Sequence, residues 1–344
     1  MPKALPRVFI HGHFAPQNFE FCWLDWLQRN SHPAQGLDQG ALLERYIPSP
    51  LLRRVLWHGF QRSLVALVSR GFIRQAVAFQ PHLVIVVSGH LVSSAALQTV
   101  RERTGAVLFH FYGEDFFNPL NTNRTLRESA HHYDHLFTTK SFNVQEMADA
   151  GIRNATYLPH GYRPNCHYPL EPSQAERDEY GSDLTFIGTW EADRASTLAQ
   201  LTEFDLRIWG ADWERAGRWQ GRSGVVQKRA VYCGEMSKVF NASKINLAFL
   251  RKANRDLHTS RTFEIPACGG FQLSERTGEV LGFFEEGKEI ECFGSVEELR
   301  DKVNYYLRHE TLRKQIASAG LARARNSPYS YTDRLQTILG YFGR

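Results

Sequence analysis

The sequence has 344 residues, of which 42% are hydrophobic and 22% are charged. These proportions are ordinary for a globular protein, and the length allows two domains with separate cores. The net charge of +5 suits phosphate-bearing ligands or an anionic membrane surface, and it is too weak to indicate nucleic acid as a partner. No apolar run approaches the roughly 18 residues of a membrane span.

The cysteines and the N-terminal residues indicate in which cellular compartment the protein is expected. The five cysteines are scattered, odd in number and without a C-x-x-C pair: Cys22, Cys166, Cys233, Cys268 and Cys292. This pattern predicts reduced thiols and disfavours a zinc site or a disulfide framework. The first residues run into a predicted strand without a signal-peptide core. We therefore expect a cytoplasmic protein, with peripheral contact at the inner membrane face as an open alternative.

The first half of the chain alternates predicted strands and helices. The strands are Arg7–Gly12, Pro81–Ser88 and Ala106–Tyr112, and a helix is predicted over Phe19–Arg29. A strand, a glycine turn and a helix resemble the opening unit of a nucleotide-binding α/β domain. In a two-domain enzyme, the loop of Gly12 and His13 would face the cleft between the domains, although a plain turn explains them equally well.

Polar residues near the third of these strands are further candidates. Glu114 and Asp115 directly follow the strand, where side chains reach the carboxyl edge of a parallel sheet. His110 lies inside the strand, which favours a hydrogen-bonded core histidine. His131 and His135 have the i, i+4 spacing of metal ligands, but no third ligand is near, so a solvated helix face is favoured.

Leu51–Gln80 is basic and amphipathic. Its apolar residues recur at helical spacing, with arginines between them: Arg53, Arg54, Arg62, Arg70 and Arg74. Such a helix can lie on an anionic membrane or receive a charged acceptor. A helix packed on a sheet, with arginines extending from its edges, is the favoured interpretation.

The second half repeats the strand–helix alternation after an aperiodic stretch, Arg163–Gly181, which is predicted to be a linker. Its predicted elements are strands at Asp183–Gly188, Asp205–Gly210 and Lys244–Leu250, a turn or short strand at Val231–Glu235, a helix opened by a Ser295/Glu298 capping box, and helices at Thr311–Arg325 and Tyr331–Phe342. Two such alternations predict two doubly wound α/β domains.

The most informative stretch is Arg261–Ser274, which follows the predicted strand Lys244–Leu250 and a polar loop. Gly269-Gly270 should stop a short helix before the next strand. The polar loop that follows the strand lies at the carboxyl edge of a parallel sheet, where ligands bind. It is cationic: Arg251, Lys252, Arg255 and Arg261. Glu264 is four residues after Ser260, so the capping-box spacing of three does not explain this acid.

Arg261–Ser274 resembles the signature of the CgeB-type, spore-maturation-like glycosyltransferases, within the group 1 nucleotide-sugar transferases. The resemblance continues through Phe283–Ile290 to Gly320 and is weak in the first half. It implies the GT-B architecture, in which two Rossmann-like domains face a cleft. The implied parts are an acceptor-side domain at 1–165, a linker at 166–181, a nucleotide-sugar domain at 182–326 and a helix at 327–344 that crosses back to the first domain.

The resemblance also implies roles for individual residues. Asp256 and Glu264 match two acids, eight positions apart, that contact the donor, and Arg194 matches a residue placed against the diphosphate. The resemblance also favours His110 as a site residue, because the group often carries a histidine at the end of the matching strand. The predicted catalytic residues are Glu264, Asp256, Asp115 and His110. The predicted donor-binding residues are Gly188, Thr189, Arg194, Gly210, Tyr232, Arg251, His258, Arg261 and Glu264.

The sequence thus predicts a glycosyltransferase that moves a sugar from a nucleotide-diphosphate sugar, with a UDP-sugar as first choice, to a glycan, lipid or protein acceptor. No metal or other cofactor is expected, because cations and helix amides can stabilise the departing diphosphate. Retention of configuration is favoured, and an inverting enzyme would need a base such as Asp115. Two alternatives stay open, a sugar-nucleotide epimerase and a catalytically silent nucleotide-sugar-binding protein.

Overall fold

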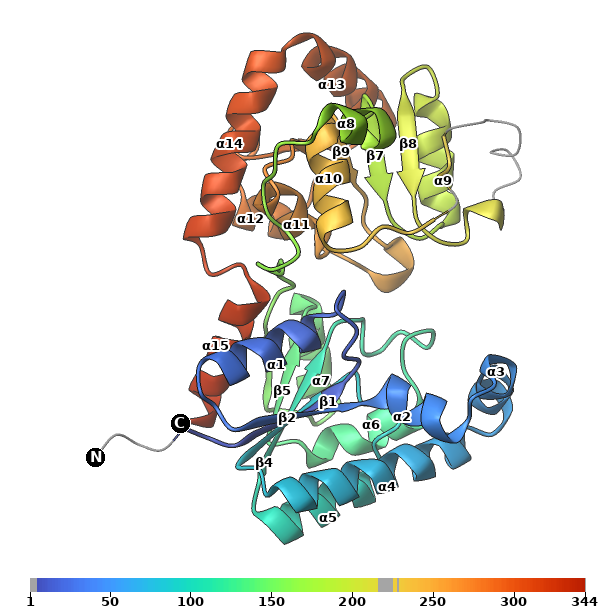
Figure 1. The fold of residues 1–344 in the computed structure, drawn as a ribbon, viewed down its shortest axis with the longest axis vertical. Helices are drawn as coiled ribbons and strands as arrows, with labels where there is room; N and C mark the ends of the chain where they lie inside the picture. The colour runs from blue at the N-terminus through green and yellow to red at the C-terminus, as the bar shows by residue number, and fades with distance from the viewer. Residues whose placement is uncertain (1–4, 216–224, 228, 344) are drawn as a thin grey trace. The chain divides into compact units, whose positions relative to one another are not determined.

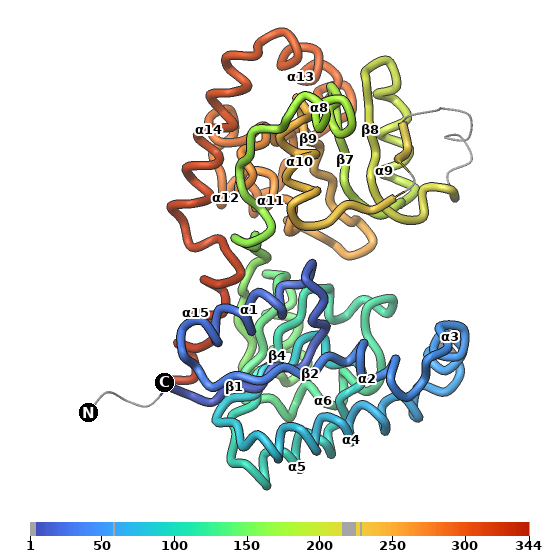
Figure 2. The backbone as a smooth tube through the Cα atoms, in the orientation of Figure 1, coloured from blue at the N-terminus to red at the C-terminus, as the bar shows by residue number. Residues whose placement is uncertain are grey.

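A computed structural model describes residues 5–215, 225–227 and 229–343 (Figure 1). The chain forms two compact units. Unit 1 comprises Met1–Pro159 and Thr332–Arg344, and unit 2 comprises His160–Tyr331. The chain enters unit 2 once and returns to unit 1 once, as the backbone trace shows (Figure 2). In the parts of the chain described, no helix is long and apolar enough to cross a membrane.

Unit 1 contains a six-stranded parallel sheet of order β2-β1-β3-β4-β5-β6. The strands are β1 (Val8–Gly12), β2 (Ala34–Asp38), β3 (Leu83–Val87), β4 (Val107–Tyr112), β5 (His135–Thr138) and β6 (Ala155–Tyr157). The helical segments are α1 (Phe19–Arg29), α2 (Gln39–Tyr46), α3 (Pro50–Gly59), α4 (Gln61–Phe79), α5 (Ser94–Thr104), α6 (Arg124–Ser129), the 3₁₀ turn η1 (Ala130–His132), α7 (Ser141–Asp149) and α15 (Tyr331–Phe342).

Helices cover both faces of this sheet. Because side chains alternate along a strand, Val84 and Val86 of β3 share a core with Phe72 of α4. On the other face, Phe111 of β4 contacts Trp23 of α1, with ring centroids 5.3 Å apart. The near-continuous apolar strands are therefore buried on two sides, as expected for a parallel sheet.

Unit 2 contains a five-stranded parallel sheet of order β11-β10-β9-β7-β8. Its strands are β7 (Leu184–Ile187), β8 (Leu206–Trp209), β9 (Ile245–Ala248), β10 (Gln272–Glu275) and β11 (Glu291–Phe293). Its helices are α8 (Gln174–Tyr180), α9 (Ala192–Leu198), α10 (Gly234–Ala242), α11 (Arg261–Ala267), α12 (Gly278–Phe283), α13 (Val296–Arg308) and α14 (Glu310–Asn326), with 3₁₀ turns η2 (Ala199–Leu201), η3 (Trp213–Arg215) and η5 (Lys252–Asn254). The predicted fold class, with two doubly wound sheets, is confirmed.

Three local predictions are wrong. The stretch taken as an aperiodic linker contains α8, whose capping box pairs Ser173 with Glu176. Leu51–Gln80 forms two helices, α3 and α4, of which α4 is packed on the sheet and α3 is largely exposed. His131 and His135 do not share a helix face, because η1 ends at His132 and His135 begins β5.

Candidate functional site

A pocket of about 400 Å³ lies in unit 2 beyond the ends of β7 and β9. β8 and β9 flank β7 on opposite sides, so the chain leaves β7 and β9 at the topological switch point of the sheet. In open parallel sheets this point is where ligands bind. The lining residues are Phe186, Ile187, Gly188, Thr189, Trp190, Glu191, Arg194, Phe249, Arg251, Thr259, Ser260 and Arg261.

Two glycines shape the floor of this pocket. Gly188 follows β7, and its N–H donates to the carbonyl of Trp209 at 2.8 Å. Gly210 follows β8 with φ near +149°, and a Cβ at this position would lie 2.0 Å from the carbonyl oxygen of Gly188. Only glycine therefore allows the two turns to approach this closely. Gly210 acts by supporting Gly188 and is not itself among the lining residues.

Glu191 connects two arginines of the pocket. Its Oε1 is 2.8 Å from Nε of Arg251, and its Oε2 is 3.7 Å from Nε of Arg194. The carboxylate thus lies between two guanidinium groups, as an anionic ligand group would. Glu191 was not singled out from the sequence.

Arg194 is buried, yet its guanidinium is weakly held. Its Nη1 and Nη2 each lie 3.4 Å from a carbonyl oxygen, of Thr189 and Phe249 respectively. These distances exceed the usual 2.7–3.2 Å range for N–H···O bonds. Arg194 can therefore turn toward a stronger acceptor in the pocket without losing good hydrogen bonds.

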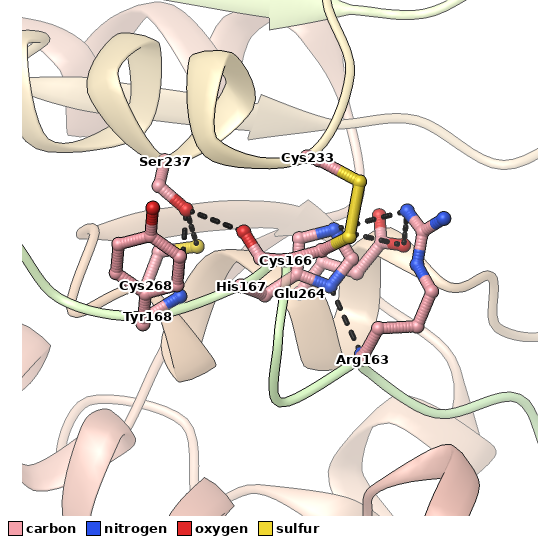
Figure 3. Close-up of a disulfide and its surroundings, with 8 residues drawn as sticks. All are labelled: Arg163, Cys166, His167, Tyr168, Cys233, Ser237, Glu264 and Cys268. Carbon is pink, nitrogen blue, oxygen red and sulfur yellow. Dashed lines mark hydrogen bonds and ion pairs between the residues drawn. A yellow bond between two sulfur atoms is a disulfide. The ribbon is translucent and has the colours of Figure 1, made fainter. Parts of the chain in front are cut away.

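Glu264 lies behind the pocket, surrounded by Arg261, Arg163 and His167, and Figure 3 shows the last two beside it. Arg261 donates to its Oε2. On the other oxygen, Arg163 Nη2 is 3.8 Å and His167 Nε2 is 3.5 Å from Oε1. The Nδ1 of His167 accepts from the backbone N–H of Arg163 at 3.0 Å, which leaves the ring proton on Nε2, toward Glu264.

The charges of this cluster depend on one another. Burial is the largest influence on Glu264 and opposes its ionisation, but Arg261, His167 and Arg163 outweigh it and lower its pKa from 4.5 to about 2. Burial also lowers the pKa of His167 from 6.5 to about 4. Glu264 is therefore ionised and His167 neutral at pH 7. Glu264 is 3% exposed, and its ion pair with Arg261 helps to hold that residue at the pocket wall.

A disulfide between Cys166 and Cys233 adjoins this cluster, because Cys166 precedes His167 (Figure 3). The prediction that all five thiols are reduced is therefore wrong for this pair. Cys22, Cys268 and Cys292 are buried thiols outside the disulfide. The disulfide joins the segment that enters unit 2 to the start of α10, 67 residues later.

Other predicted donor residues of unit 2 have internal partners. Asp256 accepts from the side chain of Asn254 at 2.6 Å and from the N–H of Arg251 at 3.3 Å, which closes the loop after β9. His258 is 1% exposed, with Nδ1 at 2.6 Å from Glu279 and Nε2 accepting from a backbone N–H. Tyr232 is exposed and does not line the pocket.

Of the predicted site residues in unit 1, His110 and Asp115 are buried and His13 is exposed. His110 is fully buried, stacked on Tyr133 with ring centroids 4.7 Å apart, and burial lowers its pKa to about 4. Asp115 is 1% exposed and accepts from the side chain of Asn143 at 3.0 Å. Gly12 ends β1, and His13 is exposed beside it, at the switch point between β1 and β3.

The pocket brings together five of the predicted donor residues, Gly188, Thr189, Arg194, Arg251 and Arg261. Sequence reasoning missed Glu191, Arg163 and His167, whose roles depend on partners distant in the chain. Within the described ranges, no group of three or more His, Cys, Asp or Glu side chains is arranged to hold a metal ion.

The family described as glycosyl transferase-like matches residues 194–340. The match includes the pocket residues Arg194, Arg251 and Arg261 and the buried Glu264. No curated protein matches the chain.

Solved structures match over nearly the whole chain. One is sucrose-phosphate synthase from Thermosynechococcus elongatus, with 10% identity, a TM-score of 0.68 and 98% of each chain covered. Another is Alr3699/HepE from Anabaena in complex with UDP-glucose, with 13% identity, a TM-score of 0.61 and coverage of 98% of this chain and 99% of that chain. A UDP-N-acetylglucosamine 2-epimerase matches with 13% identity, a TM-score of 0.61 and coverage of 99% and 98%.

At identities this low, the likeness concerns the fold. The chain has the GT-B fold, and residues 194–340 within it match the glycosyl transferase-like family.

Proposed function

We propose that this protein is a glycosyltransferase that moves a sugar from a nucleotide-diphosphate sugar to an acceptor hydroxyl. The observation that carries the proposal is the pocket at the switch point of unit 2, where Arg194, Arg251 and Arg261 converge. The glycosyl transferase-like match covers these three arginines. A UDP-sugar is the proposed donor, because the structures of Anabaena HepE contain UDP and UDP-glucose.

The proposed mechanism rests on the charge of the leaving group. A nucleoside diphosphate gains negative charge as its bond to the sugar breaks, and fixed cations stabilise that charge most when they need not reorganise. Arg261 is held in place by Glu264, and Arg194 and Arg251 would exchange Glu191 for the diphosphate. Three arginines can supply this stabilisation without a metal, so we propose a metal-independent reaction. Transfer should survive EDTA, and restoration by Mg²⁺ or Mn²⁺ after a loss would contradict it.

Retention of configuration is the proposed stereochemical course, because it requires no general base from unit 1. Asp115, the base that inversion would need, is buried and accepts internal hydrogen bonds from Asn143 and from the N–H of Phe117. The acceptor is proposed to be a glycan, a lipid-linked sugar or a protein, with Gly12 and His13 on its side. NMR of the product's anomeric configuration tests the course directly.

Calorimetric titration with UDP and uridine tests the donor site. Arg194→Ala and Arg251→Ala should each weaken UDP binding by roughly 10- to 150-fold and leave uridine binding nearly unchanged, because each removes a charge-assisted contact of about 1.5–3 kcal/mol. Arg300→Ala is the matched control, since Arg300 is exposed and pairs with Glu203 away from the pocket. Equal losses for UDP and uridine would show that the arginines act on the fold.

A sugar-nucleotide epimerase is the second candidate, favoured by the structural match to a UDP-N-acetylglucosamine 2-epimerase. The two activities differ in their products. Incubation of UDP-sugars with and without acceptors, followed by chromatography, distinguishes a transferred sugar with released UDP from an interconverted free donor. Binding of UDP with neither product would indicate a nucleotide-sugar-binding protein.

A further inference from the structure

The strongest surface feature outside the pocket is helix α3 of unit 1. Figure 1 shows α3 at the margin of this unit, beside the start of α4. Among its large apolar side chains, only Leu56 packs against the core of the unit. Leu51 is 72% exposed, Leu52 48% and Val55 49%. Amphipathic spacing predicted that these residues would be covered by the sheet, and they are not.

The exposed apolar residues form one face. At 100° per residue, Leu51, Val55 and Leu52 fall within an arc of about 100°. The opposite side faces the body of the unit, where Arg53 donates to the carbonyl of Ile47 at 3.2 Å and pairs with Glu44 at 3.4 Å. Phe60, which follows the helix, is also 62% exposed. A ten-residue helix of this kind is about 15 Å long.

The sequence around this face is strongly basic, with Glu44, the partner of Arg53, as the acid at its start. Between Glu44 and Glu102 the sequence has no aspartate or glutamate, and it has seven arginines: Arg45, Arg53, Arg54, Arg62, Arg70, Arg74 and Arg101. Arg54 lies at the edge of the apolar arc, and Arg62, Arg70 and Arg74 follow one exposed side of α4. In the described part of the chain, none of these four forms an ion pair, so they are available to an anionic partner.

We propose that α3 is a membrane-docking helix that lies in the headgroup layer of an anionic bilayer, with Leu51, Leu52 and Val55 in the acyl boundary. Apolar side chains rimmed by an excess of arginines are what such an interface selects. The same charge disfavours a second copy of this chain as the partner, because two such faces would bring like charges together. The proposal rests on unit 1 alone and is independent of the proposed transferase activity.

Sedimentation with phosphatidylcholine vesicles, with and without phosphatidylglycerol, tests this proposal on the full chain. The protein should bind only the vesicles that contain phosphatidylglycerol, and salt should release it. Leu51→Gln/Val55→Gln should abolish binding. Arg62→Gln and Arg70→Gln should each lower the partition coefficient about fivefold. Leu120→Gln is the matched control, because Leu120 is an exposed leucine of unit 1 outside α3 and should leave binding unchanged.

The contradicting outcomes are specific. No binding to either vesicle, or equal binding of the Leu51→Gln/Val55→Gln variant, would overturn the proposal. Concentration-dependent dimerisation that this variant abolishes, without vesicle binding, would assign the face to a second copy of the chain instead.

Discussion

Replacing Glu264 by glutamine removes one negative charge from the buried cationic cluster while keeping the shape of the side chain. Burial opposes the ionisation of Glu264, and Arg261, His167 and Arg163 reverse that effect, so its pKa falls from 4.5 to about 2. A lowered carboxylate pKa stabilises the folded state above pH 4.5, and this contribution is lost as the pH falls toward 2. The difference corresponds to about 3 kcal/mol of unfolding free energy at pH 7.

Urea unfolding of the wild type and of Glu264→Gln, compared at several pH values, measures this quantity. The gap between the two proteins should be about 3 kcal/mol at pH 7 and about 1.5 kcal/mol at pH 3. The gap at pH 7 reports on Glu264 most directly, because His167 is neutral there in both proteins. Below pH 6.5 the variant loses more stability through His167 than the wild type does, since Glu264 raises the pKa of His167 against the effect of burial. UDP binding should also weaken in the variant, since Arg261 loses its partner.

Glu310→Gln is the control for this experiment. Glu310 is an exposed carboxylate of α14 that pairs with Lys314 at 2.6 Å, and such surface pairs contribute less than about 1 kcal/mol. If Glu264→Gln costs no more than this control, or if its cost is the same at pH 7 and pH 3, the cluster does not hold Glu264 as described.

Three further predictions concern the same unit. Cys166→Ser/Cys233→Ser should lower the unfolding free energy by about 4 kcal/mol, because the disulfide links cysteines 67 residues apart. Differential alkylation and mass spectrometry of the wild type should first find both cysteines protected, and two reactive thiols would refute the disulfide. Glu191→Gln should raise the affinity for UDP several-fold in calorimetry, because the neutral amide no longer competes with the diphosphate for Arg194 and Arg251. Weaker binding would show that Glu191 itself supports binding of UDP. Gly210→Ala should cost more than about 2 kcal/mol in urea unfolding and distort the pocket, whereas Gly282→Ala, with open space around its Cβ, should be nearly neutral.

The sequence was most informative where strands are buried on both faces. β3 is a continuous apolar run and β4 and β9 are each interrupted by one polar residue, and all three were predicted to within a few residues. β2 was missed because its sequence, Ala34–Asp38, buries only Leu37 at the edge of the sheet and shows no apolar run. α8 carried a readable signal, the Ser173/Glu176 capping box, inside a stretch otherwise rich in turn residues.

Fewer features of the candidate site than of the fold could be predicted from the sequence. Arg194, Arg251 and Arg261 could be proposed because each stands near the end of a predicted strand or at the start of a helix. The pairing of Glu191 with Arg251 could not, because it joins residues 60 positions apart that meet only through the parallel pairing of β7 with β9. Helical spacing likewise could not tell a packed α4 from an exposed α3, since both show the same period.

The last helix of the structure has a consequence for how the protein is made. Tyr341 of α15 packs on His135 and Phe137 of β5, and Arg334 donates to the carbonyl of Pro159 at 2.9 Å, so α15 completes the sheet layer of unit 1. The 172 residues His160–Tyr331 are translated before Thr332–Gly343, which takes roughly 10 to 30 seconds at the usual 5–20 residues per second. During that interval the aromatic face of β5 has no cover from its own helix. The nascent chain therefore presents a hydrophobic surface that chaperones can bind, and the unit begun first on the ribosome is the one finished last.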